Sequence, residues 1–230
     1  MKKVLLSKEF LDMYKEGGRT FSDITLQYMD IADVNLTDLI IKNSKLFFAT
    51  FRNCNFKNSK FINCEIIYGS FYGGNLEGVV FDNCTIDMTL FQDTIFRDTK
   101  ISKSRLIWSA FLNTAIGEID LSSSTKFKVF TDLSEITAKD IEDGMAHLGP
   151  LIDSLDISIR HKIKQELEKD FQSLGIKDLP NSSKNLEYQR TSPLVYGMQT
   201  FSNMIIDAYN TANPYRQKKS IYEKEGGYKS

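Results

Sequence analysis

The chain has 230 residues, 41% of them hydrophobic, and its 29 Lys and Arg against 30 Asp and Glu give a formal net charge of −1. This length allows one or two domains, and the balanced charge argues against direct binding of nucleic acid. No apolar run approaches the roughly 18 residues of a membrane-spanning helix, and the run near the N-terminus has only three residues, too few for a signal peptide. We therefore expect a cytoplasmic protein without a membrane partner.

Residues 1–18 are predicted to form a helix that caps the next part of the chain. Ser7 suits the N-cap of a helix that runs to about Glu16, and Gly17 with Gly18 suits its end. The apolar face of this helix consists of Phe10, Leu11 and Tyr14. A solenoid needs its open ends covered, and this helix directly precedes a repeat. A partner-binding helix is the less favoured interpretation.

The central part of the chain has a strict period of five residues. Every fifth residue from Phe21 to Leu121 is Leu, Ile or Phe, which makes 21 consecutive matches. The residue two positions earlier is mostly small, as in Ser44, Ala49 and Cys54. Such alternation places a large and a small residue inward and leaves three outward positions in each unit. This stretch is therefore an internal repeat.

The second residue after each central residue predicts a turn. It is usually Asp, Asn or Gly, which tolerate turn conformations with positive φ. The exceptions include five larger residues, each 20 positions after the last: Tyr28, Phe48, Tyr68, Met88 and Trp108. Because 20 residues contain four units, the sequence predicts four sides per coil. The central residues Phe51, Phe71, Phe91 and Phe111 should then stack as an interior ladder.

This pattern resembles the pentapeptide-repeat family, whose unit has a small residue, a polar residue, a central Leu or Phe and two further residues. The resemblance covers residues 19–123. It implies a right-handed, four-sided β-helix of about five coils over residues 19–124. The expected fold class is thus mainly β with α, a β-helix solenoid with an N-terminal capping helix and a C-terminal α-helical region.

One outer side of the predicted β-helix carries large apolar residues from coil to coil. These candidate docking residues are Tyr28, Phe47, Phe48, Ile67, Tyr68, Met88, Ile107 and Trp108, and we call them the apolar wall. A contiguous apolar surface of this size marks a face that is covered. Two interpretations of what covers this face remain open. The C-terminal helices of the same chain are favoured, and a homodimer or another protein partner is the alternative.

The sequence predicts an α-helical domain over residues 125–213. Thr137 and Asp140 resemble a capping box at the start of its first helix. The clearest helix spans 156–174, with an apolar stripe made of Ile159, Ile163, Leu167, Phe171 and Leu174. A third helix begins near Ser192, with Leu194, Met198, Phe201, Ile205 and Tyr209 on its apolar face. Residues 214–230 are rich in Lys, Glu and Gly and are predicted to be disordered.

The sequence offers little for catalysis. His147 and His161 are the only histidines, and neither stands at a recognisable spacing from a nucleophile. Cys54, Cys64 and Cys84 all occupy small inward positions, which predicts packing, with neither a metal nor a cofactor bound. We therefore expect a non-enzyme, a protein-interaction scaffold or regulator that presents a rigid surface.

An alternative function follows from the resemblance. Some pentapeptide-repeat proteins mimic duplex DNA, bind type II topoisomerases such as gyrase, and protect against quinolones. Those proteins owe the mimicry to an acidic surface. Between residues 19 and 120 this chain has ten Lys or Arg against twelve Asp or Glu, so the sequence favours the scaffold over the DNA mimic.

Overall fold

The computed structural model describes residues 3–132, together with residues 135, 137, 139, 140, 143, 144, 146 and 147. The chain divides into two units between Thr131 and Asp132. The predicted helices over 156–174 and 192–209 and the predicted tail over 214–230 lie outside the described residues. Within the described part, no helix is long and apolar enough to cross a membrane.

The strands of the first unit form two parallel sheets. The nine-stranded sheet contains β1 (Lys3–Leu5), β3 (Ile24–Ala32), β5 (Lys45–Arg52), β7 (Glu65–Ile67), β8 (Ser70–Tyr72), β10 (Thr85–Asp87), β11 (Leu90–Gln92), β13 (Arg105–Leu112) and β15 (Thr125–Phe130). The six-stranded sheet contains β2 (Thr20–Ser22), β4 (Ile40–Lys42), β6 (Lys60–Ile62), β9 (Val80–Asp82), β12 (Thr99–Ser102) and β14 (Ile119–Asp120). A 3₁₀ turn spans Ile116–Glu118.

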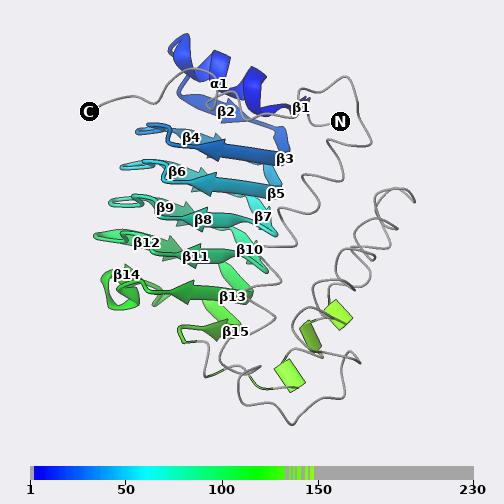
Figure 1. The fold of residues 1–230 in the computed structure, drawn as a ribbon, viewed down its shortest axis with the longest axis vertical. Coiled ribbons are helices and arrows are strands. Elements are labelled where there is room, and N and C mark those ends of the chain that lie inside the picture. The colour runs from blue at the N-terminus through cyan, green and yellow to red at the C-terminus, as the bar shows by residue number, and fades with distance from the viewer. Residues whose placement is uncertain are drawn as a thin grey trace, which may run out of the picture. The chain divides into compact units, whose positions relative to one another are not determined.

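These strands stack as the coils of a parallel β-solenoid (Figure 1). From β2 onward each pairing joins residues 20 positions apart, as in Phe51 with Phe71, and isolated parallel bridges follow the same offset from Asn35 to Asn55. The backbone repeat is therefore 20 residues, as the spacing of the large turn residues predicts.

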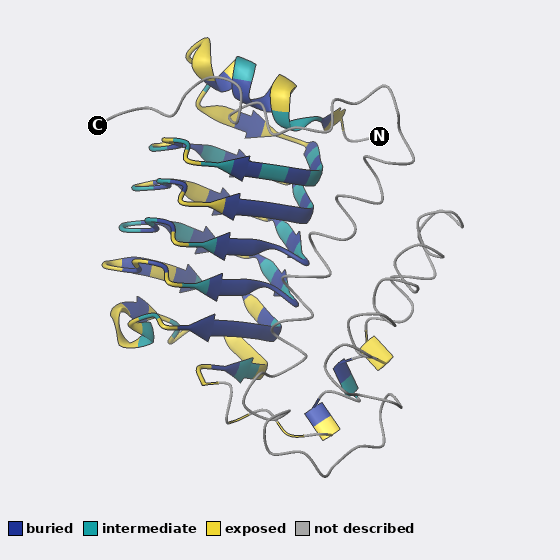
Figure 2. Cartoon of the chain, in the orientation of Figure 1, coloured by how far each residue is buried: buried dark blue, intermediate teal, exposed yellow. Residues whose placement is uncertain are grey.

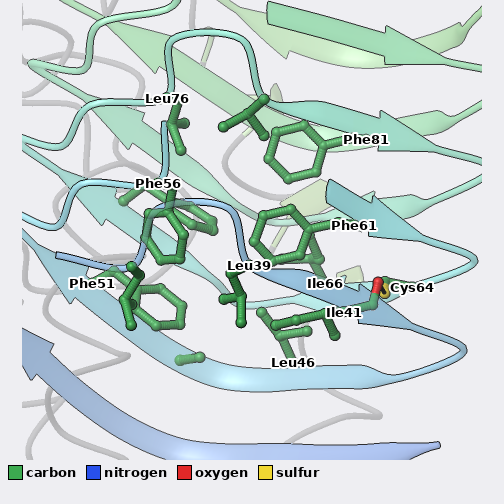
Figure 3. Packing of buried hydrophobic residues seen from close by; sticks show 14 of the residues in the cluster. Leu39, Ile41, Leu46, Phe51, Phe56, Phe61, Cys64, Ile66, Leu76 and Phe81 are labelled. Carbon is green, nitrogen blue, oxygen red and sulfur yellow. Dashed lines mark hydrogen bonds between the residues drawn. The ribbon is translucent and has the colours of Figure 1, made fainter. Parts of the chain in front are cut away.

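The five-residue period determines the interior of the solenoid. The central residues from Phe21 to Phe111 are all buried, and dark blue runs along the strands in Figure 2. Phe71 stacks on Phe51 and Phe91 with ring centroids 5.2 and 5.1 Å apart, and Figure 3 shows the neighbouring side chains. Small inward residues bond the backbone: the Thr89 hydroxyl donates to the carbonyl of Ile66 at 3.3 Å. These bonds satisfy polar groups that would otherwise be buried without partners.

The predicted turn positions have the expected backbone. Asn43, Asn63 and Asn83 all have φ near +50°, and their side-chain amides form a ladder: Asn63 donates to Oδ1 of Asn43 at 3.1 Å, and Asn83 donates to Oδ1 of Asn63 at 2.8 Å. Gly73 has φ of +63°, and a Cβ there would lie 2.4 Å from Oδ1 of Asn53. The Asp, Asn and Gly pattern thus correctly predicts these left-handed turns.

At the N-terminal end, helix α1 (Ser7–Lys15) packs on the first coil. Its buried residues are Phe10, Leu11 and Tyr14, as predicted. The ring of Phe10 lies 4.9 Å from that of Phe21, and the Tyr14 hydroxyl donates to the carbonyl of Thr37 at 2.9 Å. The predicted N-cap at Ser7 is wrong.

Leu6 holds the N-cap position with extended backbone and without a capping side chain. The reason is β1, which pairs with β3 as far as Leu5, so the chain leaves the sheet only at Leu6.

At the other end, β15 continues the parallel pairing past the predicted boundary at residue 124. Lys126 pairs with Leu106, so a lysine stands where the next central residue would be. The hydrogen bonds of β13 set this register even though the side chain breaks the pattern. Further along, Thr137 and Asp140 form the reciprocal bonds of a capping box: Thr137 N donates to Oδ2 of Asp140 at 2.8 Å, and Asp140 N donates to Oγ1 of Thr137 at 3.2 Å.

Candidate interaction surface

The apolar wall includes a corner of the solenoid where large side chains adopt a left-handed backbone. The corner residues and their φ values are Tyr28 (52°), Phe48 (51°), Tyr68 (55°), Met88 (46°) and Trp108 (48°). In this conformation the Cβ of an L-residue crowds the following carbonyl oxygen, at a cost of about 1–2 kcal/mol per residue. Asn, Asp or Gly occupies most of the other corner positions. The wall therefore carries local backbone strain that its sequence could have avoided.

Side chains of the corner residues contact one another from coil to coil. The rings of Tyr28 and Phe48 stack with centroids 5.5 Å apart, and those of Phe48 and Tyr68 stack at 5.0 Å. The hydroxyl of Tyr68 donates to Sδ of Met88 at 2.5 Å. Stacked aromatic pairs contribute about 0.5–1.5 kcal/mol beyond the area that they bury. These contacts offset part of the strain, although each is weak alone.

Two further sets of ring contacts involve the wall, one beside this corner and one at the C-terminal end of the wall. Phe47 packs edge-on against Phe48 with centroids 4.7 Å apart. Trp108 packs against the rings of Phe127 and Phe130 at 6.1 and 6.2 Å, so β15 adds to the wall at its C-terminal end. The sequence interpretation missed both phenylalanines because it ended the repeat one strand earlier.

The predicted wall residues differ in exposure. Phe48 is 0% exposed, Tyr68 and Met88 are 2% exposed and Trp108 is 3% exposed, although none of the four belongs to the interior cluster. The remaining members, which are Tyr28, Phe47, Ile67 and Ile107, are half-buried. The structure therefore brings all eight candidates together on one side and removes four of them from solvent.

A second row beside the corner was missed by the sequence interpretation. It consists of Thr50, Ser70, Leu90 and Ala110, which stand one residue before the phenylalanine ladder and are all buried. Within the part of the chain that the structure describes, the hydroxyl oxygens of Thr50 and Ser70 have no hydrogen-bond partner. The sequence carries only a weak signal for this row, because the equivalent position on another side holds Ile40 and Val80 as well as Lys60 and Lys100.

Charges of both signs border the wall. Arg52 holds Asp30 through two bonds, from Nη2 at 2.8 Å and from Nε at 3.1 Å. Lys45 pairs with Glu65 at 2.8 Å. Because acids and bases neutralise one another along the coils, this side is not an anionic stripe.

Comparison with known proteins identifies the repeat. A family model described as pentapeptide repeats matches residues 40–78 in eight copies, one for about every five residues. Residues 40–78 are pentapeptide repeats. This stretch includes two residues of the phenylalanine ladder and four of the eight wall residues, which are Phe47, Phe48, Ile67 and Tyr68. No curated protein matches the chain.

Solved structures similar to this chain include two pentapeptide repeat proteins and a fluoroquinolone resistance protein. Rfr23, a pentapeptide repeat protein from the cyanobacterium Cyanothece 51142, is 9% identical over 54% of this chain and 94% of its own, with a TM-score of 0.43. HetL from Nostoc sp. strain PCC 7120, a pentapeptide repeat protein involved in heterocyst differentiation regulation, is 10% identical over 55% and 92%, with a TM-score of 0.15. QnrB1, a plasmid-mediated fluoroquinolone resistance protein, is 10% identical over 61% and 94%, with a TM-score of 0.23. At these identities and TM-scores, the similarity assigns neither a partner nor an activity to this chain.

The pentapeptide repeats hold their thiols in the interior. Burial raises the pKa of the Cys54 thiol to about 12, and the Cys64 side chain together with burial raises the pKa of Cys84. A thiol held in its protonated form is a poor nucleophile and a poor metal ligand. Among the described residues, His, Cys, Asp and Glu form no group of three that could bind a metal ion.

Proposed function

We propose that this protein is a non-catalytic scaffold or regulator of the cytoplasm that binds another protein segment through the apolar wall of its repeats. The single observation that carries this proposal is the row of five bulky residues at positive φ. At about 1–2 kcal/mol each, their strain is comparable with the whole stability of an ordinary domain, about 5–15 kcal/mol. Strain of this kind is retained where the side chains are needed.

The proposal includes the finer geometry of the rod, a right-handed β-helix with four sides. Each 20-residue coil contains four turn positions, illustrated by Asn43, Phe48, Asn53 and Asn58, all with positive φ. Coils stack at the spacing of neighbouring strands, about 4.8 Å. The wall would then present one side chain per coil along a straight line. A partner that repeats an apolar residue every 5–6 Å, as one stripe of an α-helix does, fits such a line.

The second candidate function, topoisomerase binding by DNA mimicry, has less support. It needs a continuous anionic surface, whereas the described residues pair Arg52 with Asp30 and Lys57 with Glu77. A supercoiling assay with purified gyrase distinguishes the two functions. The scaffold proposal expects no change in gyrase activity at micromolar protein, and protection of gyrase from a quinolone would favour the mimic.

The scaffold proposal is tested by site-specific photocross-linking in the cells from which the chain comes. The photoreactive residue p-benzoylphenylalanine replaces Phe47 in the wall or, as a matched control, Ile62, which is an outward, half-buried residue of β6 on another side. We expect a covalent adduct with a defined second protein from position 47 and none from position 62. Equal adducts from both positions, or none from position 47 in any growth condition, would contradict the proposal.

A further inference from the structure

We infer that the outer edge of β15 is a docking site for an acidic, extended segment of another protein, which pairs with this edge as an additional strand. The site differs from the apolar wall of the proposed function, because its main contacts are backbone hydrogen bonds and ion pairs at the end of the sheet. The inference therefore holds whether or not the wall binds a partner.

β15 ends the nine-stranded sheet at the C-terminal end of the stack (Figure 1). It pairs with β13 and with no other strand in the part of the chain that the structure describes. The Thr125 amide donates to the carbonyl of Ser104 at 2.9 Å, so the backbone groups of Thr125 point toward β13. Because these groups alternate in direction along a strand, those of Lys126 point to the opposite edge. An added strand can bond them.

An exposed aromatic ring stands between the two lysines of β15. Phe127 is 58% exposed, more than any other large apolar residue in the described ranges, and Lys126 and Lys128 on either side of it are exposed too. Charged residues at a sheet edge hinder unwanted pairing, but an exposed phenylalanine has no such role. Aromatic residues are enriched in protein interfaces. Phe127 is therefore the apolar contact of this site.

Positive charge surrounds this edge. Between residues 103 and 130 the chain has two acidic residues, Glu118 and Asp120, and four basic residues, which are Lys103, Arg105, Lys126 and Lys128. Asp120 already accepts a hydrogen bond from the Ser122 hydroxyl at 2.7 Å and lies 4.0 Å from Lys100. Lys103, Arg105 and Lys126 form no ion pair with another described residue. The edge therefore favours a partner segment that carries carboxylates.

The same charges argue against a second copy of this chain as the added strand. Two β15 edges that pair across a two-fold axis would bring the Lys126 and Lys128 side chains of both copies beside one another. Like charges directly opposite one another destabilise a strand pair. A segment that alternates acidic and apolar residues instead places its carboxylates on the face of Lys126 and its apolar side chains on the face of Phe127.

Trp108 lies where this edge meets the apolar wall. Its ring centroid is 6.1 Å from that of Phe127 and 6.0 Å from Nζ of Lys128. A strand added to β15 therefore changes the surroundings of the only tryptophan of the chain. The fluorescence of Trp108 reports binding at this edge without a label.

The test titrates the purified full-length protein with a blocked seven-residue peptide of alternating Glu and Val, followed by calorimetry and by Trp108 fluorescence. Lys126→Glu should weaken binding about tenfold or more, because it reverses the charge that faces the carboxylates. Lys60→Glu is the matched control, at an exposed position of β6 on another side, and should leave the affinity unchanged. The absence of saturable binding at millimolar peptide, or equal losses in both variants, would overturn the inference.

Two modified peptides separate strand addition from simple charge attraction. One is N-methylated at its valines and the other at its glutamates, so each keeps every charge and blocks the backbone donors along one edge. One of the two should bind about tenfold more weakly than the unmodified peptide, and the other should not. Equal affinities of the two methylated peptides would overturn the inference. The proposed function has its own readout, the adduct from position 47 in cells, so either proposal can fail while the other stands.

Discussion

The substitution Phe48→Asn tests whether a cover holds the strained corner. Phe48 is fully buried, with φ of +51° and rings of Tyr28 and Tyr68 stacked on either side. Asn tolerates this backbone, so the change should recover about 1–2 kcal/mol of strain. It also loses about 1.5–3 kcal/mol of apolar burial and two stacked pairs of about 0.5–1.5 kcal/mol each.

The lost contacts outweigh the recovered strain when the ring is covered. Near the middle of these ranges, the free energy of unfolding should fall by about 3 kcal/mol. A solvent-exposed ring would lose little burial, and the variant would be as stable as the wild type or more stable. The change in the free energy of unfolding therefore differs between a covered and an exposed ring in sign as well as in size.

Equilibrium unfolding in urea, followed by circular dichroism of the full-length protein, measures this difference. Asn63→Phe is the matched control, because Asn63 has φ of +53° at an exposed corner on another side. It should lose about 1–2 kcal/mol through strain alone. A neutral or stabilising Phe48→Asn beside a destabilising Asn63→Phe would refute the covered wall.

Three further predictions concern the interior and the rim. Phe71→Asp should prevent folding, because it buries an unpaired charge in the phenylalanine ladder, whereas Phe71→Leu should fold with lower stability. Circular dichroism measures both variants, and a folded Asp variant would contradict the burial of this ladder. The Cys54 thiol, with its pKa raised to about 12 by burial, should resist iodoacetamide at pH 8 until denaturant is added, and rapid native alkylation would show an open coil. The hydrogen bond from Lys57 lowers the pKa of Glu77 below its ordinary 4.5, so ionised Glu77 stabilises the fold above that pH. The difference in the free energy of unfolding between wild type and Glu77→Gln should therefore shrink as the pH falls below 4.5. A difference that grows at low pH would contradict this reasoning.

Much of the fold could be predicted from the sequence because each coil repeats one simple requirement. Central residues such as Phe71 must be large and apolar because they point inward. Turn residues such as Asn63 and Gly73 must tolerate positive φ, and the structure confirms both expectations. Because the same requirement recurs in every coil, a single residue that departs from it does not hide the pattern.

The departures from the period lie where hydrogen bonds override side-chain preference. Tyr, Phe and Trp rarely adopt positive φ, so nothing local in Phe48 or Trp108 predicts their backbone. The pairing of each coil with its neighbour imposes it. Lys126 likewise indicates the end of the repeat, because a lysine replaces the central apolar residue. The backbone of β13 nevertheless pairs with β15 and so extends the sheet by one strand.

The sequence predicts the members of the candidate surface and that the surface is covered, but it does not predict which of these members are buried. Spacing alone places Phe48 and Tyr68 above one another on one side. Their exposure depends on what covers them, and a five-residue period contains no information about a segment outside the repeat. The buried hydroxyls of Thr50 and Ser70 were missed because Ser and Thr are ordinary residues at an outward position.

The fluorescence of Trp108 tests the central claim most directly, because it is the only tryptophan of the chain and stands in the wall. In the native full-length protein we predict a blue-shifted emission maximum and weak quenching by acrylamide, both of which change to those of free tryptophan on unfolding. Emission and quenching that already match free tryptophan in the native protein would contradict the claim that the apolar wall is a covered docking surface.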